Sequence, residues 1–186
     1  LGKQTEGIVA GEALLGVSIT GWMTRPELFN EEILKEGARI VKATNREVAQ
    51  FIGINKAART TTVKPSGNAS VILKTASGIH PEHSKRYFRI MQLNKDSETA
   101  KYLLENCPEV LEESVWSSTG TDYVVYSPCE NPEGTLYKEE MQGVKHLKLI
   151  ELVQNSWVSE GKNEELCYVP TTNHNVSNTV IIDNQK

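Results

Sequence analysis

Short β-branched runs alternate along this chain with longer stretches of helical spacing. Residues 14–21 form an apolar run between glycines, which predicts a short buried strand. Apolar side chains then recur at helical spacing, at Leu34, Ala38, Val41, Val48 and Ile52. They predict a helix that begins with a capping box at Thr24–Glu27 and ends at Gly53. A strand followed by a long helix is half of a βαβ unit.

The alternation continues through the middle of the chain. Residues 59–64 predict a strand, which turns at Pro65-Ser66-Gly67 into a short helix at residues 69–73. Residues 87–93 predict an extended segment, and Asp96 is placed to cap the short helix that follows.

The last part of the chain also alternates between strand-like and helix-like segments. Residues 122–126 and 175–182 are rich in β-formers and predict two further strands. Between them, one apolar face recurs at helical spacing, at Leu147, Ile150, Val153 and Trp157. This helix is predicted to end near Gly161. Strands that alternate with helices indicate an α/β layer or barrel with at least some parallel strands.

Composition narrows the class of protein. A chain of 186 residues suits one domain, and a hydrophobic content of 38% argues against disorder along its length. Twenty Lys and Arg residues against 24 Asp and Glu give a net charge of −4, with neither sign gathered in a block. We therefore expect no dedicated binding of nucleic acid or of a membrane surface.

The cysteines and the chain ends indicate a compartment. Cys107, Cys129 and Cys167 are odd in number and lie far apart, so a disulfide framework is not indicated, and each is expected to be a small buried apolar residue. No apolar stretch reaches the roughly 18 residues of a membrane span, and no signal peptide is recognised. A cytoplasmic location is predicted. Because the sequence begins at Leu1 rather than Met, we expect a piece of a larger protein.

The turn Pro65-Ser66-Gly67-Asn68-Ala69-Ser70 is the strongest candidate for a binding site. A helix N-terminus presents backbone N–H groups and the positive end of the helix dipole, and glycine lets an anion approach the backbone. The hydroxyls of Ser66 and Ser70 are further candidate donors. The turn is therefore interpreted as a phosphate site or as an ordinary strand-to-helix turn with a polar cap.

His80 and His83 are weaker candidates. Two imidazoles are typical metal ligands, but a third ligand at suitable spacing is missing and Pro81 disfavours a regular helix between them. Solvated or loop-packing histidines are the alternative, and we predict no metal site.

Five separated stretches occur in the order found in one enzyme family: Gly16-Val17-Ser18-Ile19-Thr20-Gly21, Thr61-Thr62-Val63-Lys64-Pro65-Ser66-Gly67, Ser77-Gly78-Ile79-His80-Pro81, Tyr87-Phe88-Arg89 and Asn175-Val176-Ser177-Asn178-Thr179-Val180. Together they resemble adenosylcobalamin-dependent (class II) ribonucleotide reductases. The resemblance implies an α/β fold, the C-terminal half of a ten-stranded α/β barrel, with residues 1–186 forming a single partial domain.

The resemblance also implies roles for residues. The turn formed by Pro65, Ser66, Gly67, Asn68, Ala69 and Ser70 would bind the phosphates of a ribonucleotide substrate. The family commonly has Thr or Ser at the position of Asn68, so that donor is changed here. The Asn-x-Cys-x-Glu pattern of the radical cysteine is not recognised in this sequence, and no catalytic residue is assigned to it.

The implied partners follow from the complete enzyme. They are adenosylcobalamin as cofactor, without a binding residue assigned in this sequence, a complementary N-terminal barrel segment, and a thioredoxin-type reductant. Three functions stay open: part of a ribonucleotide reductase, an inactive nucleotide-binding module, and a structural interaction domain that shares only ancestry with the reductases.

Overall fold

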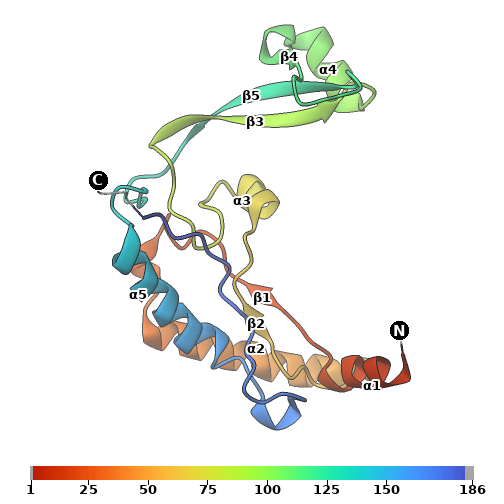
Figure 1. Cartoon of the computed structure of the whole chain (residues 1–186), viewed down its shortest axis with the longest axis vertical. Helices are drawn as coiled ribbons and strands as arrows, with labels where there is room; N and C mark the ends of the chain where they lie inside the picture. Colours follow the sequence, from red (N-terminus) through yellow and green to blue (C-terminus); the bar gives the residue numbers. More distant parts are fainter. Residues whose placement is uncertain (1, 183–186) are drawn as a thin grey trace. The chain divides into compact units, whose positions relative to one another are not determined.

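The computed structural model describes residues 2–182, which form two compact units. The first unit comprises residues 1–82 and 133–186, and the second comprises residues 83–132. Both mix helices with strands (Figure 1), so the predicted α/β character is confirmed. The single partial domain over residues 1–186 stays a prediction.

Within its described residues, the first unit contains four α-helices, two short strands and single turns of other helix types. The α-helices are α1 (Lys3–Glu12), α2 (Glu31–Ile52), α3 (Gly67–Leu73) and α5 (Gly143–Val153). The strands are β1 (Val17–Ser18) and β2 (Thr61–Thr62). The turns are the 3₁₀ helices η1 (Pro26–Leu28) and η4 (Glu164–Leu166) and the π-helical η3 (Gln154–Val158), which continues α5.

Helix α2 begins later than the sequence predicted. Asn30 is its N-cap, and the Asn30 side chain accepts a hydrogen bond of 2.9 Å from the Ile33 N–H. The predicted start at Thr24–Glu27 is wrong, because that segment enters η1 instead. The end is correct, because Gly53 adopts φ 75° and closes the helix.

Removing this cap is expected to weaken α2 measurably. Asn30→Ala leaves the N–H of Ile33 without its acceptor and should lower the free energy of unfolding by about 1 kcal/mol. Chemical denaturation monitored by circular dichroism measures the loss. Asn30→Asp retains an acceptor and serves as the control. An equal loss in both variants would contradict the capping role.

Parallel pairing joins β1 to β2, with Val17 opposite Thr61 and Ser18 opposite Thr62. In the described residues, β2 pairs with β1 alone, and the hydroxyls of its two threonines contact backbone carbonyls of other segments. Thr61 Oγ1 donates to the Trp157 carbonyl at 2.6 Å, within η3, and Thr62 Oγ1 donates to the Asn175 carbonyl at 2.9 Å. A hydroxyl that takes a helix carbonyl in this way favours local widening of the helix.

The predicted strand at residues 175–182 is wrong. Within the described residues, this segment contributes one parallel bridge, between Val176 and Val63, instead of a ladder. The bridge has two hydrogen bonds, from the Val63 N–H to the Asn175 carbonyl and from the Ser177 N–H to the Val63 carbonyl. The segment therefore follows β2 without extending the pairing.

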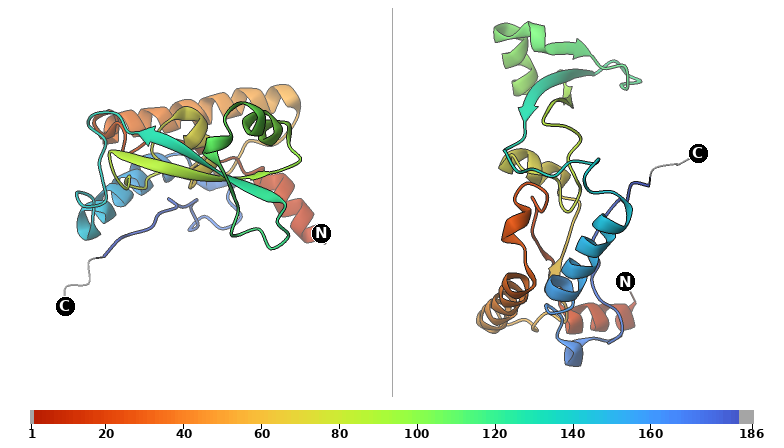
Figure 2. Two further views of the ribbon diagram at one scale, coloured as in Figure 1. Left: turned by 90° about the horizontal axis from the view of Figure 1, so that it is seen from above. Right: turned by 90° about the vertical axis from the view of Figure 1, so that its left-hand side faces the viewer.

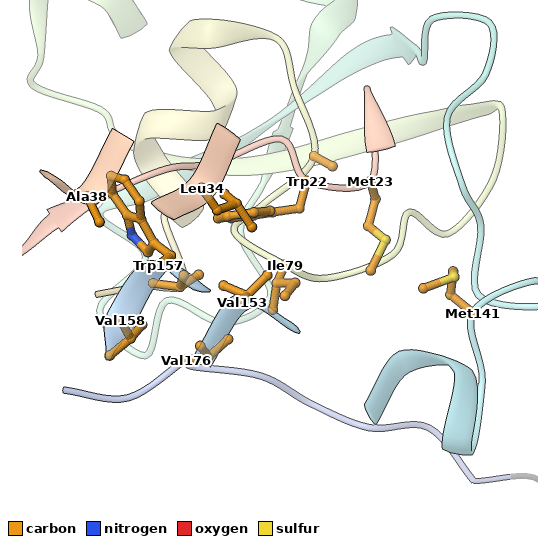
Figure 3. Packing of buried hydrophobic residues seen from close by; sticks show 12 residues of the cluster. Trp22, Met23, Leu34, Ala38, Ile79, Met141, Val153, Trp157, Val158 and Val176 are labelled. Carbon is orange, nitrogen blue, oxygen red and sulfur yellow. The ribbon is translucent and has the colours of Figure 1, made fainter. Parts of the chain in front are cut away.

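The core of the first unit lies between α2, η3 and the loop after α3 (Figure 3). Its largest side chains include Trp22, Leu34, Ile79 and Trp157, which are at most 3% exposed. A Cβ at Gly37 would lie 3.3 Å from the Trp157 ring, so glycine allows this ring to pack closely against α2. Apolar burial on this scale is the main stabilising contribution to the unit.

One ion pair is largely withdrawn from solvent. Arg59 Nη1 lies 3.1 Å from Glu12 Oε2, and the two side chains are 7% and 12% exposed. Arg59 also donates to the carbonyls of Thr172 and Val169, and Glu12 accepts from the Tyr168 N–H. The pair thus links α1, β2 and the segment after η4.

The second unit is a twisted antiparallel sheet with one helix (Figure 2). Its elements are β3 (Arg86–Asn94), α4 (Glu98–Asn106), the 3₁₀ turn η2 (Pro108–Val110), β4 (Leu111–Glu113) and β5 (Asp122–Glu130). The strand order is β3-β5-β4. Ser97, rather than the predicted Asp96, caps α4 by accepting a hydrogen bond from the Ala100 N–H.

Candidate functional site

The predicted turn lies where β2 passes into α3. Ser66 is the N-cap of α3 and adopts φ 56° and ψ 31°, a left-handed conformation that side-chain-bearing residues rarely adopt. The Ser66 carbonyl accepts a hydrogen bond of 2.9 Å from the Ser70 N–H. A strained residue that the surrounding structure holds in place is typical of functional sites.

Both predicted hydroxyl donors are used inside the turn. Ser66 Oγ donates to the Lys64 carbonyl at 3.2 Å, and Ser70 Oγ, on a buried side chain, donates to the Gly67 carbonyl at 2.9 Å. Gly67, Asn68 and Ala69 are exposed, and their N–H groups belong to the first turn of α3, which has no intrahelical partners for them. The turn therefore combines exposed residues with backbone N–H groups that lack intrahelical partners.

The loop after α3 contacts the carbonyl groups of the turn. Ser77 Oγ donates to the Pro65 carbonyl at 2.6 Å. Gly78 adopts φ 54°, and a Cβ there would lie 2.6 Å from the Lys64 carbonyl oxygen and 3.1 Å from that of Pro65. Only glycine fits this contact without a shift of the backbone.

The segment around β1 completes the support. Ser18 Oγ accepts a hydrogen bond of 2.9 Å from the Lys64 N–H. Thr20 Oγ1 accepts one of 2.8 Å from the Gly78 N–H and donates to the Ala76 carbonyl. Three stretches that are distant in the sequence thus meet at one turn, which sequence reasoning about single motifs missed.

Charge around the turn favours an anion. Residues 48–81 contain no aspartate or glutamate, but they do contain four cationic side chains, those of Lys56, Arg59, Lys64 and Lys74. Lys64 and Lys74 flank the turn and α3, are exposed, and form no ion pair within residues 2–182. An excess of positive charge beside exposed N–H groups attracts anions.

Two histidines that the sequence analysis did not single out lie close to these elements. His146 on α5 donates its Nε2–H to the Ile79 carbonyl at 3.0 Å, and His174 donates its Nδ1–H to the Thr61 carbonyl at 3.1 Å. Burial lowers the pKa of both imidazoles below the ordinary 6.5, so both are neutral at pH 7. Their spacing in the sequence carries no signal of these contacts.

The weaker candidates lie apart from any ligand set. His80 donates to the Ser77 carbonyl, and His83 is exposed. Across residues 2–182, no three His, Cys, Asp or Glu side chains are grouped so as to hold a metal ion. The three cysteines are free and half-buried, so the expectation that each is a small buried residue is wrong.

Comparisons with known proteins bear on the family. No family model matches the chain. Over 133 residues it is 24% identical to a probable adenosylcobalamin-dependent ribonucleoside-triphosphate reductase of Dictyostelium discoideum. The match covers 72% of this chain and 17% of that relative, so the chain spans about a sixth of its length. None of the helices in the described part of the chain has both the length and the hydrophobicity needed to cross a membrane.

A solved structure shows the same fold. A B12-dependent (class II) ribonucleotide reductase superimposes with a TM-score of 0.63 at 14% identity, over 83% of this chain and 26% of that one. Both comparisons therefore support the resemblance found in the sequence. The chain resembles part of an adenosylcobalamin-dependent, class II ribonucleotide reductase.

Proposed function

We propose that this chain is a C-terminal part of a class II ribonucleotide reductase, which converts ribonucleotides to deoxyribonucleotides by radical chemistry. In this proposal, Pro65, Ser66, Gly67, Asn68, Ala69 and Ser70 bind the phosphates of the substrate. The observation that carries it is the turn itself, in which a left-handed Ser66 begins α3 and the exposed residues Gly67, Asn68 and Ala69 have N–H groups without intrahelical partners.

The fold fits a partial barrel. The parallel pair of β1 and β2, with α2 following β1, has the connectivity of a βαβ unit. Apolar side chains along α2 and the β1 segment, among them Leu15, Val17, Ile40 and Val48, are 36% exposed or more. We infer that these elements supply the last strands of a ten-stranded α/β barrel and that an N-terminal barrel segment completes it.

The complete enzyme would use adenosylcobalamin to generate its radical. The cobalt of adenosylcobalamin is held by the corrin ring of the cofactor itself, so binding it needs no cluster of metal-ligating side chains. We assign no residue of this chain to the cofactor or to the radical cysteine and derive no step through them. A thioredoxin-type reductant and a cytoplasmic location belong to the same proposal.

An inactive nucleotide-binding module derived from the same family is the second candidate. It is favoured by the missing Asn-x-Cys-x-Glu pattern in this sequence. Both candidates require phosphate binding at the turn, and they differ only in chemistry. Mixing this chain with a separately produced segment that carries the radical cysteine distinguishes them. Cofactor-dependent deoxyribonucleotide formation supports the reductase, and a stable complex of both parts that forms no product supports the inactive module.

Phosphate binding is expected to depend on Gly67. A Cβ at this residue meets no heavy atom within 4 Å, so Gly67→Leu should fold normally while its side chain covers the exposed N–H groups. We expect affinity for a ribonucleoside triphosphate to fall about tenfold or more in calorimetric titration. Gly7→Leu, in α1, is the control because its Cβ also meets no heavy atom within 4 Å and its backbone, like that of Gly67, is not left-handed. Unchanged affinity in Gly67→Leu would contradict the site.

A further inference from the structure

His146 is a fully buried histidine with one nitrogen left without a partner. Its side chain is 0% exposed, and Nε2–H donates to the Ile79 carbonyl at 3.0 Å. Because a carbonyl can only accept, the neutral ring carries its proton on Nε2. Nδ1 is buried and has no hydrogen-bond partner among the described residues.

A short chain of contacts leads from this ring to the turn. Ile79 is a core residue two positions after Ser77, whose Oγ donates to the Pro65 carbonyl, and it directly follows Gly78, whose backbone packs closely against the Lys64 carbonyl. The hydrogen bond of His146 therefore fixes the loop on which the turn rests.

Protonation would disturb this arrangement. A proton on Nδ1 adds a buried N–H that has no acceptor in the described structure, and it adds a positive charge that burial disfavours. The titratable group that acts on the ring is His80, in the same loop, and its charge also opposes the imidazolium. Movement of the loop that carries Ile79 and His80 away from the ring would relieve both effects.

We propose that His146 is a positioning residue whose protonation weakens anion binding by the turn of residues 65–70. The inference rests on the proposed function, because the turn must bind an anion for its affinity to change. It predicts that affinity is full when His146 is neutral and falls as the ring becomes protonated at lower pH.

The test compares the complete chain with His146→Gln. A glutamine amide can donate to the Ile79 carbonyl but does not titrate in this range. Sulfate is the probe, because it stays a dianion well below the ordinary pKa of histidine, and burial places the pKa of His146 on that lower side. Nuclear magnetic resonance follows the His146 ring and the amides of Ser66 and Gly67, with and without sulfate.

We expect sulfate affinity of the unsubstituted chain to fall several-fold as pH decreases, with Ser66 and Gly67 amide shifts that follow the His146 titration. His146→Gln should bind with little dependence on pH. The same pH dependence in both proteins, or amide shifts that do not follow His146, would overturn the inference. If sulfate binds at no pH, the proposed function fails, and the ligand-free amide shifts still decide the coupling. If the variant does not fold, the titration of the unsubstituted chain decides.

Discussion

Gly78→Ala is expected to lower the free energy of unfolding by about 2 to 6 kcal/mol and to weaken nucleotide binding about tenfold or more. The alanine Cβ would lie 2.6 Å from the Lys64 carbonyl oxygen, and the backbone of Gly78 is in the left-handed region at φ 54°. The backbone strain at residue 78 and the steric overlap of its Cβ with the Lys64 carbonyl oxygen therefore add. Both are relieved only if the loop or the turn moves.

A matched control separates the overlap from the strain. Gly53 adopts φ 75°, and a Cβ there meets no atom within 4 Å. Gly53→Ala should therefore cost only the conformational penalty, about 1 kcal/mol, and should leave nucleotide binding unchanged. Denaturant unfolding and calorimetric titration measure both quantities. Equal effects of the two substitutions would show that Gly78 does not support the turn.

Arg59→Met is expected to lower the free energy of unfolding by about 3 to 5 kcal/mol, because it leaves the Glu12 carboxylate nearly buried without its cation. The carbonyls of Thr172 and Val169 lose their donors as well. Adding Glu12→Gln removes the uncompensated charge, so the double variant should recover part of the loss. Thermal or chemical unfolding of the four proteins in this cycle measures the coupling.

An exposed pair provides the comparison for Arg59. Arg39 lies 3.1 Å from Glu160, with side chains 57% and 27% exposed. Arg39→Met should change stability by less than about 1 kcal/mol, because water already solvates and screens the pair. A loss at Arg59 as small as that at Arg39 would show that the buried pair contributes little.

Local signals in the sequence located the turn and the ends of several elements. The β-branched run followed by Pro65-Ser66-Gly67 predicted β2 and α3, and Gly53 predicted the end of α2. These positions depend on backbone preferences that act within a few residues. Asn30, followed by two glutamates, is an equally local capping signal. The start of α2 was therefore predictable from the sequence, although Thr24 offers a competing capping signal.

Long-range contacts account for what the sequence did not predict. The π turn η3 depends on Thr61 Oγ1, which reaches the carbonyl of a residue 96 positions away. Residues 175–182 have strand composition, yet only Val176 forms a bridge. Helix α1 was not predicted because it has no buried face, and Glu12 at its end is held by Arg59 instead. Such contacts exist only after the chain has folded.

The candidate site also has one part that local sequence signals predict and one part that depends on long-range contacts. Its exposed N–H groups follow from a helix start, which the sequence predicted. Its support by Ser18, Ser77 and Gly78 depends on β1 and the loop after α3 meeting the turn in space, and the order of family-like stretches was the sequence signal for it. The buried His146 carried no such signal.

The most direct test of the phosphate site is a map of backbone amide shifts during titration with a ribonucleoside triphosphate. We predict saturable shifts at Gly67, Asn68, Ala69 and Ser70, reproduced by inorganic pyrophosphate and absent in Gly67→Leu. Saturable shifts confined to residues outside this turn, or no shifts at ligand concentrations that bind other phosphate sites, would contradict the proposal.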